Sequence, residues 1–319
     1  MRSVFPLVLL SVLFTPARAQ SFTEYDIPTP NSEPFSIVTG PDGALWFTEQ
    51  DGNKIGRVTT TGVFTEYTLP EPDSSPIWIK VGPDGALWFT EHVGNRIGRI
   101  TTAGAITEYP LSTPHSGPWN IVVGPNGETL WFTQNGGLQV GAITTSGEIT
   151  EFSVSLAPWD MTVGPDGALW YTERNNNRVA RFITSGVVTN QYIVPTPGSA
   201  PNFIITGPDE NLWFSEQAAG KLAQLTVLGV FTEFPLPNAK CQPGSLAAGP
   251  DGNIYFTEHA SNQIGILTLP GTITEYRVPT SNSLPMVMEP GPDGAMWFTE
   301  FYGNKIGRMT VPGSEGGAH

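Results

Sequence analysis

The sequence predicts an all-β fold, a seven-bladed β-propeller of four-stranded antiparallel blades closed into a ring by its N-terminal strand. Three observations predict it: one unit recurs seven times, each unit has room for four short strands, and the two chain ends carry complementary parts of one unit. A period of about 40 to 45 residues is typical of propeller blades. The 36 glycines and 30 prolines are spread along the whole chain, as expected for many strands joined by tight turns.

The repeat is followed most easily by its central aromatic residue. Each unit contains a proline-led apolar segment, Gly-Pro-Asp-Gly-Ala, Leu-Trp-Phe-Thr-Glu, Gly-Asn-Lys-Ile-Gly-Arg and Thr-Glu-Tyr-x-Leu-Pro, with variations. The central aromatic residues are Trp46, Trp88, Trp131, Trp170, Trp213, Tyr255 and Trp297. In the first unit we expect strands over 35–39, 44–48, 55–59 and 64–69, where β-branched and aromatic residues predominate. No segment has the periodicity of a helix.

The two ends of the chain predict how the ring closes. The last unit stops after its Gly-Asn-Lys-Ile-Gly-Arg segment at 303–308, without an outer Thr-Glu-Tyr strand. The missing strand is found at 22–25, ahead of the first complete unit. We therefore expect the N-terminal strand to complete the last blade, which leaves only short protected edges. The propeller should span 20–313, followed by a disordered tail at 314–319.

The first nineteen residues predict a secretory signal peptide. Arg2, an apolar run over 4–14 and Ala17-Arg18-Ala19 have the layout of a leader and its cleavage site. We therefore expect a secreted protein. Cys241 is the single cysteine of the chain, so no intrachain disulfide can close the fold.

The charge of the chain bears on its partners. A formal net charge of −14 repels phosphate groups, which argues against nucleic acid and anionic membrane as partners. We expect a monomer that binds a small-molecule ligand or substrate.

The repeat also predicts which end of the ring carries function. In an up-and-down blade the Gly-Pro-Asp-Gly and Thr-Thr-x-Gly turns share one end, here named the turn face. The segments after Trp-Phe-Thr-Glu and the crossovers between blades share the other end, here named the varied face. Its loops differ from blade to blade, and binding sites tend to lie on such loops.

One ring of residues at the varied face ends the Trp-Phe-Thr-Glu motif. Its members are Glu49, Glu91, Gln134, Glu173, Glu216, Glu258 and Glu300. Several carboxylates together could bind a divalent cation. A residue repeated in every blade is explained more simply as holding its loop, by accepting backbone N–H bonds or by pairing with the Lys or Arg that follows. We expect no metal site.

A second ring follows the crossover prolines, near the axis of the propeller. Most of its members are large and apolar, and some must serve packing between blades. The residues that we select as candidate ligand contacts are Phe35, Trp78, Trp119, Trp159, Phe203 and Met286. Adjacent aromatic side chains at the mouth of a channel can form an apolar binding surface.

Two Glu-His pairs lie on the same face, Glu91-His92 and Glu258-His259. They are weak candidates for acid and base catalysis. The alternative is that both are ordinary surface polar residues. No zinc-spaced cluster, glycine-rich phosphate loop or nucleophile elbow appears in the sequence.

The repeated motifs closely resemble those of the virginiamycin B lyases over essentially the whole chain after residue 19. The resemblance implies a seven-bladed propeller that linearises a cyclic depsipeptide antibiotic by elimination, with carboxylates holding magnesium and a histidine as base. It places Pro-His in the innermost strand of blade six, Glu-Pro-His in blade seven and a further Glu after the blade-seven Trp-Phe segment. The matching residues here are Pro243-Gly244, Leu284-Pro285-Met286 and Phe301. We expect no cofactor. Magnesium would be expected only if the protein retains a lyase activity.

Three hypotheses follow, and the sequence leaves open whether the protein is an enzyme. In the leading one, the varied face binds an apolar or macrocyclic small molecule, and any catalysis would be a cyclisation, isomerisation or elimination. The second is an active magnesium-dependent C–O lyase with relocated residues, using Glu258-His259 or Glu91-His92. The third is a non-enzymatic interaction platform for a surface protein or glycan. A deep apolar cup on the varied face would favour the first, and a flat polar face the third.

Overall fold

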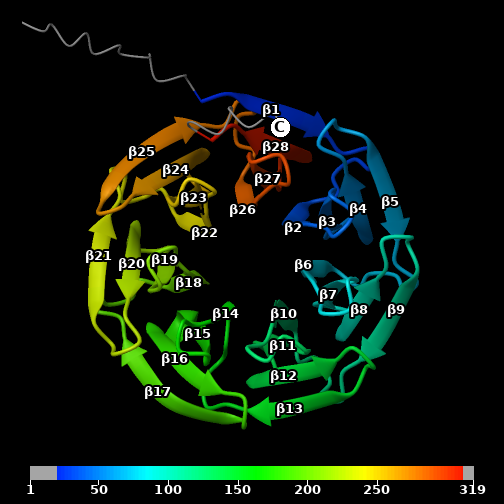
Figure 1. Ribbon diagram of the computed structural model, residues 1–319, viewed down its shortest axis with the longest axis horizontal. Coiled ribbons are helices and arrows are strands. Elements are labelled where there is room, and N and C mark those ends of the chain that lie inside the picture. The colour runs from blue at the N-terminus through cyan, green and yellow to red at the C-terminus, as the bar shows by residue number, and fades with distance from the viewer. Residues whose placement is uncertain (1–19, 312–319) are drawn as a thin grey trace, which may run out of the picture.

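The computed structural model describes residues 20–311. It consists of seven four-stranded antiparallel sheets arranged around a central axis (Figure 1). The predicted fold class is therefore confirmed. The helical element of the described chain is a single 3-10 turn, η1 (Arg174–Asn176), and no helix within 20–311 is long and apolar enough to cross a membrane. The expected signal peptide, 1–19, and the expected tail, 314–319, lie outside the described residues.

The strands occupy the same four positions in every blade. The innermost strands are β2 (Pro34–Thr39), β6 (Pro76–Val81), β10 (Pro118–Val123), β14 (Met161–Val163), β18 (Pro201–Thr206), β22 (Pro243–Ala248) and β26 (Pro285–Pro290). The second strands are β3 (Leu45–Glu49), β7 (Leu87–Glu91), β11 (Thr129–Gln134), β15 (Leu169–Glu173), β19 (Leu212–Glu216), β23 (Ile254–Glu258) and β27 (Met296–Glu300). The third strands are β4 (Lys54–Val58), β8 (Arg96–Ile100), β12 (Gln139–Thr144), β16 (Arg178–Ile183), β20 (Lys221–Leu225), β24 (Gln263–Thr268) and β28 (Lys305–Met309). The outer strands are β5 (Phe64–Thr68), β9 (Ile106–Pro110), β13 (Ile149–Ser153), β17 (Val187–Ile193), β21 (Phe231–Pro235), β25 (Thr272–Arg277) and, in blade seven, β1 (Phe22–Asp26).

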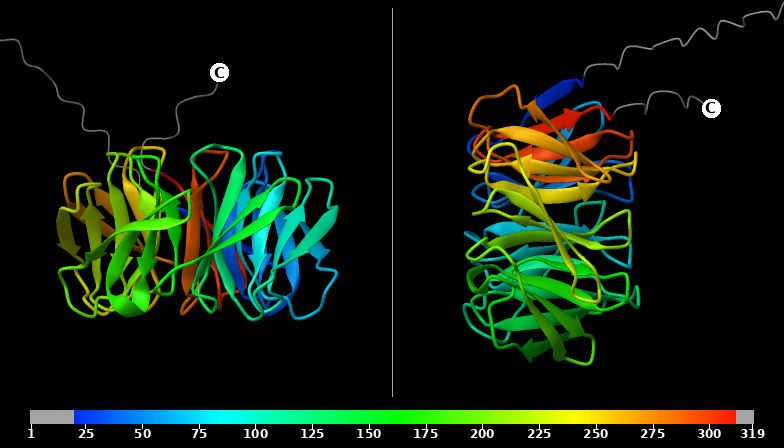
Figure 2. Two further views of the ribbon diagram at one scale, coloured as in Figure 1. Left: turned by 90° about the horizontal axis from the view of Figure 1, so that it is seen from below. Right: turned by 90° about the vertical axis from the view of Figure 1, so that its left-hand side faces the viewer.

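The ring closes as predicted, with β1 completing the last blade in the order β1-β28-β27-β26. Phe22 pairs with Met309, and Tyr25 pairs with Ile306. The Tyr25 ring stacks on Trp297 with 5.6 Å between ring centroids. Both ends of the described chain leave the ring at one face (Figure 2), the turn face.

The turn face is held by a hydrogen-bond pattern that the motif repeats. In blade one, Trp46 Nε1 donates to Asp42 Oδ1 at 3.0 Å, and Arg57 Nε donates to Asp42 Oδ2 at 2.7 Å. These two donors hold the pKa of Asp42 below its usual value, although partial burial acts in the opposite direction. The Gly-Pro-Asp-Gly turn is thus tied to the buried second strand. This supports a structural role for the repeated turns.

A second set of bonds joins neighbouring blades near the varied face. In blade one, the Thr48 hydroxyl of the Trp-Phe-Thr-Glu motif donates to the Ile77 carbonyl of blade two at 2.8 Å. The equivalent bonds in other blades are Thr90 to Trp119, Thr133 to Trp159, Thr172 to Asn202, Thr257 to Met286 and Thr299 to Phe35. Each acceptor is the residue after a crossover proline. The main chain of this second ring is therefore fixed by the preceding blade.

Candidate functional site

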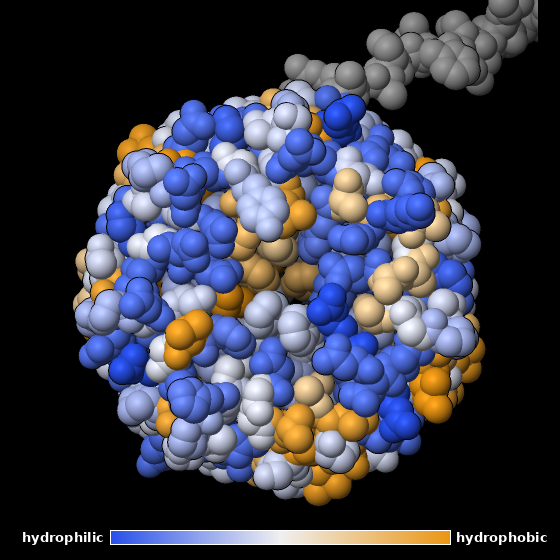
Figure 3. All heavy atoms as spheres, turned by 180° about the vertical axis from the view of Figure 1, so that it is seen from behind, coloured by the Kyte–Doolittle hydropathy of each residue, from blue (hydrophilic) through white to orange (hydrophobic). Residues whose placement is uncertain are grey.

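The varied face is hollowed at its centre. Figure 3 views the ring from the side opposite Figure 1, and hydrophobic colours gather around the hollow while most of the surrounding face is hydrophilic. We name this hollow the axial cup and define it by Phe35, Trp78, Trp119, Trp159, Phe203, Met286 and Phe301. An apolar hollow at the axis of a propeller is the kind of concave surface that binds small molecules.

A local irregularity of the innermost strand creates the cup. In six blades the register between the innermost and second strands shifts directly after the crossover proline, for example between Pro34 and Ile37 in blade one. There the Thr48 hydroxyl accepts the Ser36 N–H at 3.0 Å. The side chain of Phe35 consequently leaves the regular sheet pattern. Blade four differs, because its innermost strand begins only at Met161.

The structure brings the six predicted ligand-contact residues close together. Phe35 meets Trp119 edge to face at 5.4 Å between ring centroids, and Trp119 meets Trp159 at 4.5 Å. Trp78 stacks on Phe203 at 5.7 Å and lies 6.3 Å from Phe35. These five rings form one connected aromatic cluster. Met286 packs against the same apolar core as Phe35 and Trp78.

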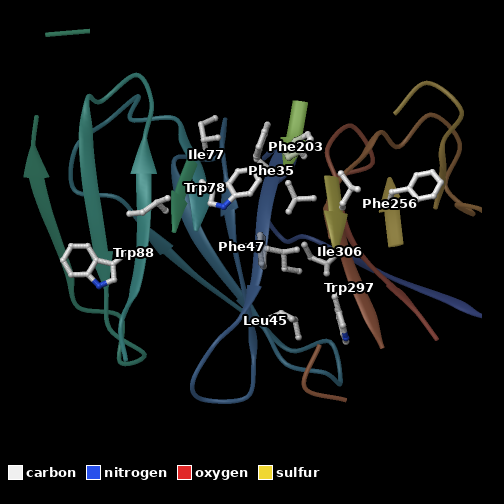
Figure 4. Close-up of a cluster of buried hydrophobic side chains, with 14 of the residues drawn as sticks. Phe35, Leu45, Phe47, Ile77, Trp78, Trp88, Phe203, Phe256, Trp297 and Ile306 are labelled. Carbon is white, nitrogen blue, oxygen red and sulfur yellow. The ribbon is translucent and has the colours of Figure 1, made fainter. Parts of the chain in front are cut away.

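The cup has a buried floor and a more exposed wall. Phe35, Trp78 and Phe203 are buried and form the floor, and Figure 4 shows them gathered at one end of the apolar core, away from Leu45 and Trp297. Trp119 and Trp159 are partly exposed and form part of the wall. The floor therefore serves packing between blades, as expected for part of the second ring. The wall leaves Trp119 and Trp159 partly exposed, and ligand contact by the second ring stays a prediction.

A small cavity lies on the other side of the floor, inside the ring. It has a volume of about 90 Å³, and both Trp78 and Phe203 line it. Its polar lining includes the ion pair of Lys80 with Glu289 and the buried Asp160. Asp160 accepts hydrogen bonds from Ile204 N at 2.7 Å and from Asn120 Nδ2. Burial raises the pKa of Asp160 to about 7.

The ring of motif glutamates does not face the cup. Glu49 is completely buried, and its neighbour is the outer-strand Glu66, which is paired with Lys54 at 3.0 Å. Burial, together with the Glu66 charge, raises the pKa of Glu49 to about 8. In blade four the outer residue is Gln191, whose Nε2 donates to Glu173 at 2.8 Å. The predicted way of holding the loop is therefore wrong for Glu49: within the described chain both of its oxygens lack a hydrogen bond, and the Lys54 that follows pairs with Glu66 instead. The carboxyl is buried among neighbouring side chains, which agrees with a structural role and not with a ligand at the cup.

The magnesium implied by the family resemblance does not fit this chain. Gly244, Leu284, Met286 and Phe301 occupy the four matching positions, and none of them offers a side-chain oxygen. Within residues 20–311, no group of three or more His, Cys, Asp or Glu side chains could hold a metal ion. We therefore derive no chemistry from magnesium.

The two Glu-His pairs are not brought together as acid and base. Glu258 lies with Cys241, Ser261 and Glu275, whereas His259 packs edge to face against Phe203 with 6.4 Å between ring centroids. Strand alternation directs the neighbouring side chains to opposite sides. His259 is only 8% exposed, so its interpretation as a surface residue is wrong.

His92 lies beside the wall of the cup. Its ring meets Trp119 edge to face at 5.5 Å, and its Nδ1 lies 3.3 Å from the Pro118 carbonyl. Because a carbonyl only accepts, this contact places the proton on Nδ1 and leaves the Nε2 lone pair free. Burial lowers the pKa of His92, so the ring is neutral at pH 7. Its partner in sequence, Glu91, is completely buried and away from this ring.

Sequence reasoning missed two polar residues of the wall, Arg174 and Gln217. The Arg174 guanidinium lies over the Trp159 ring at 5.1 Å from its centroid, and it donates to Gln217 Oε1 at 2.5 Å. The signal was present in the repeat, because both residues directly follow the motif glutamate, as His92, His259 and Phe301 do.

Comparisons with known proteins agree with the fold. The family described as "Virginiamycin B lyase family" matches residues 17–157 and 153–316. The crystal structure of virginiamycin B lyase from Staphylococcus aureus is similar at 36% identity and a TM-score of 0.87, covering 92% of this chain and 100% of that one. A catalytically inactive histidine-to-alanine variant of the Staphylococcus aureus lyase, crystallised with quinupristin, is similar at 35% identity with the same TM-score, over 92% of this chain and 100% of that chain. Virginiamycin B lyase from Bacillus licheniformis is 50% identical over 40 residues, a match that spans 12% of this chain and 14% of that protein.

Proposed function

Because this chain belongs to the virginiamycin B lyase family, we propose that its varied face binds an apolar macrocyclic small molecule of the streptogramin type. The connected aromatic cluster of the axial cup carries this proposal. A lyase of the same fold has been crystallised with quinupristin, which supports the ligand class. We also propose, from the sequence of 1–19, that the protein is secreted.

The partly exposed wall of the cup offers apolar surface that a ligand can cover. Trp119 and Trp159 present large, rigid apolar surfaces that lose little conformational freedom when a ligand covers them. Beyond the cup, Tyr302 is 68% exposed and its ring contacts Phe301 at 5.1 Å. Val93, which follows His92, is 64% exposed. Apolar surface thus extends from the axis toward the rim, as a ligand broader than the cup would require.

The same geometry favours a small molecule over a surface protein or glycan. A platform for a polar macromolecule would present a flat, charged face. This face is instead hollow and apolar at its centre (Figure 3).

A second candidate function is elimination on a cyclic depsipeptide with His92 as the base. The free Nε2 lone pair of a neutral imidazole beside the wall favours it. In such a step the base takes the Cα proton, the electron pair of that C–H bond forms a Cα=Cβ double bond, and the Cβ–O bond breaks with its electron pair leaving on the ester carboxylate. The linear product has the same mass as the ring, whereas hydrolysis adds one water.

Binding is tested with quinupristin and the full chain by isothermal titration calorimetry. Replacing Trp119 and Trp159 together by Ala should weaken binding at least about tenfold, because truncated aromatic contacts commonly cost more than 1 kcal/mol. Leu228→Ala is the matched control, since Leu228 is 86% exposed in a turn at the opposite face. If the Trp variant and the wild type bind quinupristin with equal affinity, the wall of the cup is not the binding site and the proposal is refuted.

Catalysis is tested separately, by chromatography and mass spectrometry of quinupristin after incubation. A linear product of unchanged mass that disappears in His92→Ala would establish elimination by this residue. If quinupristin binds and stays intact, the protein is a binder and the lyase candidate fails.

A further inference from the structure

We infer that Arg174 and Gln217 form an anion-binding site in the wall of the axial cup, which recognises a carboxylate group on the ligand. The inference rests on the proposed function, because it names a chemical feature of the molecule that the cup would hold. It concerns residues that sequence reasoning did not select.

The first observation is that Arg174 is a cation without a carboxylate partner. Among the residues described, Arg174 forms no ion pair, whereas Arg57, Arg99, Arg181 and Arg308 each bond to a turn-face aspartate at 2.6 to 2.7 Å. Its Nε is buried and makes no hydrogen bond. The nearest carboxyl in sequence, Glu173, is bonded to Gln191 instead. A half-buried guanidinium in this state is costly unless an anion satisfies it.

The second observation is that the guanidinium is held in place. Arg174 begins the short turn η1 directly after β15, and its side chain lies over Trp159. Gln217, which directly follows β19, accepts one guanidinium N–H through Oε1. A cation fixed over an aromatic face loses less freedom when it binds a ligand.

The third observation is a relay that fixes Gln217 in turn. A guanidinium only donates, so the Gln217 oxygen must face Arg174 and its amide nitrogen must face His259 Nδ1, 3.3 Å away. His259 therefore carries its proton on Nε2. Its burial and the nearby Arg174 charge lower its pKa to about 4, so the ring is neutral and adds no competing charge.

Gly244 makes this arrangement possible. A Cβ atom at residue 244 would lie 1.9 Å from His259 Nε2, so any larger residue there would displace the imidazole. His259 thus fills the space beside the position where the family resemblance places a histidine. We regard His259 as a positioning residue for Gln217, and the guanidinium as the group that meets the ligand.

The chemistry of the site points to a carboxylate. The planar guanidinium matches a carboxylate with two parallel N–H···O bonds, and the adjacent Trp159 and Trp119 rings suit an aromatic or apolar group on the same molecule. The chain is strongly acidic, at −14, so a carboxylate would be repelled from most of its surface. Affinity for such a ligand would therefore depend on this one cation.

The test uses two probes that differ only in charge, N-benzoylphenylalanine and N-benzoylphenylalanine amide, titrated into the full chain. The wild type should bind the carboxylate at least about tenfold more tightly than the amide, as expected for charge-assisted hydrogen bonds. Arg174→Gln should remove this preference by weakening carboxylate binding at least about tenfold relative to amide binding. Arg174→Lys should retain part of the preference for the carboxylate, because the positive charge remains although the bidentate hydrogen bonding is lost.

Lys240→Gln is the matched control, because Lys240 is an exposed cation in a crossover of the same face. It should leave the preference intact. If Arg174→Gln fails to fold by circular dichroism, Gln217→Ala provides a second variant, which should weaken carboxylate binding several-fold and spare the amide. Equal binding of the two probes by the wild type, or an unchanged preference in Arg174→Gln, would overturn the inference alone. Binding of neither probe would also overturn the inference, whereas the proposed function is decided separately by the quinupristin titration.

Discussion

Removing the strand that closes the ring should destabilise the whole protein. A chain that begins at Thr29 instead of Gln20 loses β1, with its five paired residues on β28. It also loses Ile27, which is 4% exposed, and the partly buried Phe22 and Tyr25. Full burial contributes about 1.5 to 3 kcal/mol for each such side chain, or at most about 9 kcal/mol for the three. Because Phe22 and Tyr25 are only partly buried, we expect the combined contribution of the three to be about 4 to 6 kcal/mol before the released strand regains entropy.

Such a loss is large beside a typical domain stability of about 5 to 15 kcal/mol. The melting temperature should fall by about 10 °C or more, since about 1 kcal/mol shifts a protein of this size by about 2 to 4 °C. The bare edge of β28 should also promote aggregation. Both are measured by calorimetry and light scattering against the chain that begins at Gln20.

A peptide spanning 20–28 provides the internal control. Supplied in excess to the shortened chain, it should restore much of the melting temperature, because β1 docks through pairing and side-chain contacts alone. A peptide of the same composition in scrambled order should not. An unchanged melting curve for the shortened chain would refute the idea that β1 holds the ring closed.

Two further predictions concern the repeated polar pairs. The raised pKa of Glu49 and Glu300, about 8 for each, means that the folded state binds more protons than the unfolded state between about pH 4.5 and 8, so stability should fall as pH rises through this window. Glu49→Gln, neutral at every pH, should therefore raise the melting temperature at pH 8 and change it little at pH 5; an equal change at both values would contradict the assignment. On the turn face, Asp84→Ala removes the acceptor of Trp88 Nε1 and Arg99 Nε, and denaturant unfolding should show a loss of about 1 to 3 kcal/mol. A loss below about 0.5 kcal/mol, the usual scatter of surface substitutions, would mean that the turn holds its shape without this residue.

The fold was predictable because the same pattern of strand and turn residues occurs in seven consecutive units. Buried Trp-Phe-Thr-Glu strands, glycine turns and one displaced outer strand admit few arrangements other than a closed ring. The aromatic members of the cup were predictable for a similar reason: large apolar residues such as Trp119 stand where the regular blade does not need them.

The polar wall was less accessible to sequence reasoning. Strand alternation predicts that Glu258 and His259 point apart, but not that His259 enters the space above Gly244. The contact between Arg174 and Gln217 depends on the distance between two neighbouring blades and on the turn η1, neither of which has a sequence motif. The partner of Glu49 was missed because Glu66 lies two strands away in the same blade.

The bonds between blades have a consequence for how this scaffold can be altered. At six junctions a threonine hydroxyl of one blade holds the main-chain carbonyl of the residue after the crossover region in the next blade. The side chains of those acceptors play no part in the bond. Positions such as Trp119, Trp159 and Met286 are thus open to substitution without loss of a contact that aligns the blades. The recognition surface of this scaffold can therefore change one side chain at a time while the arrangement of the blades stays the same.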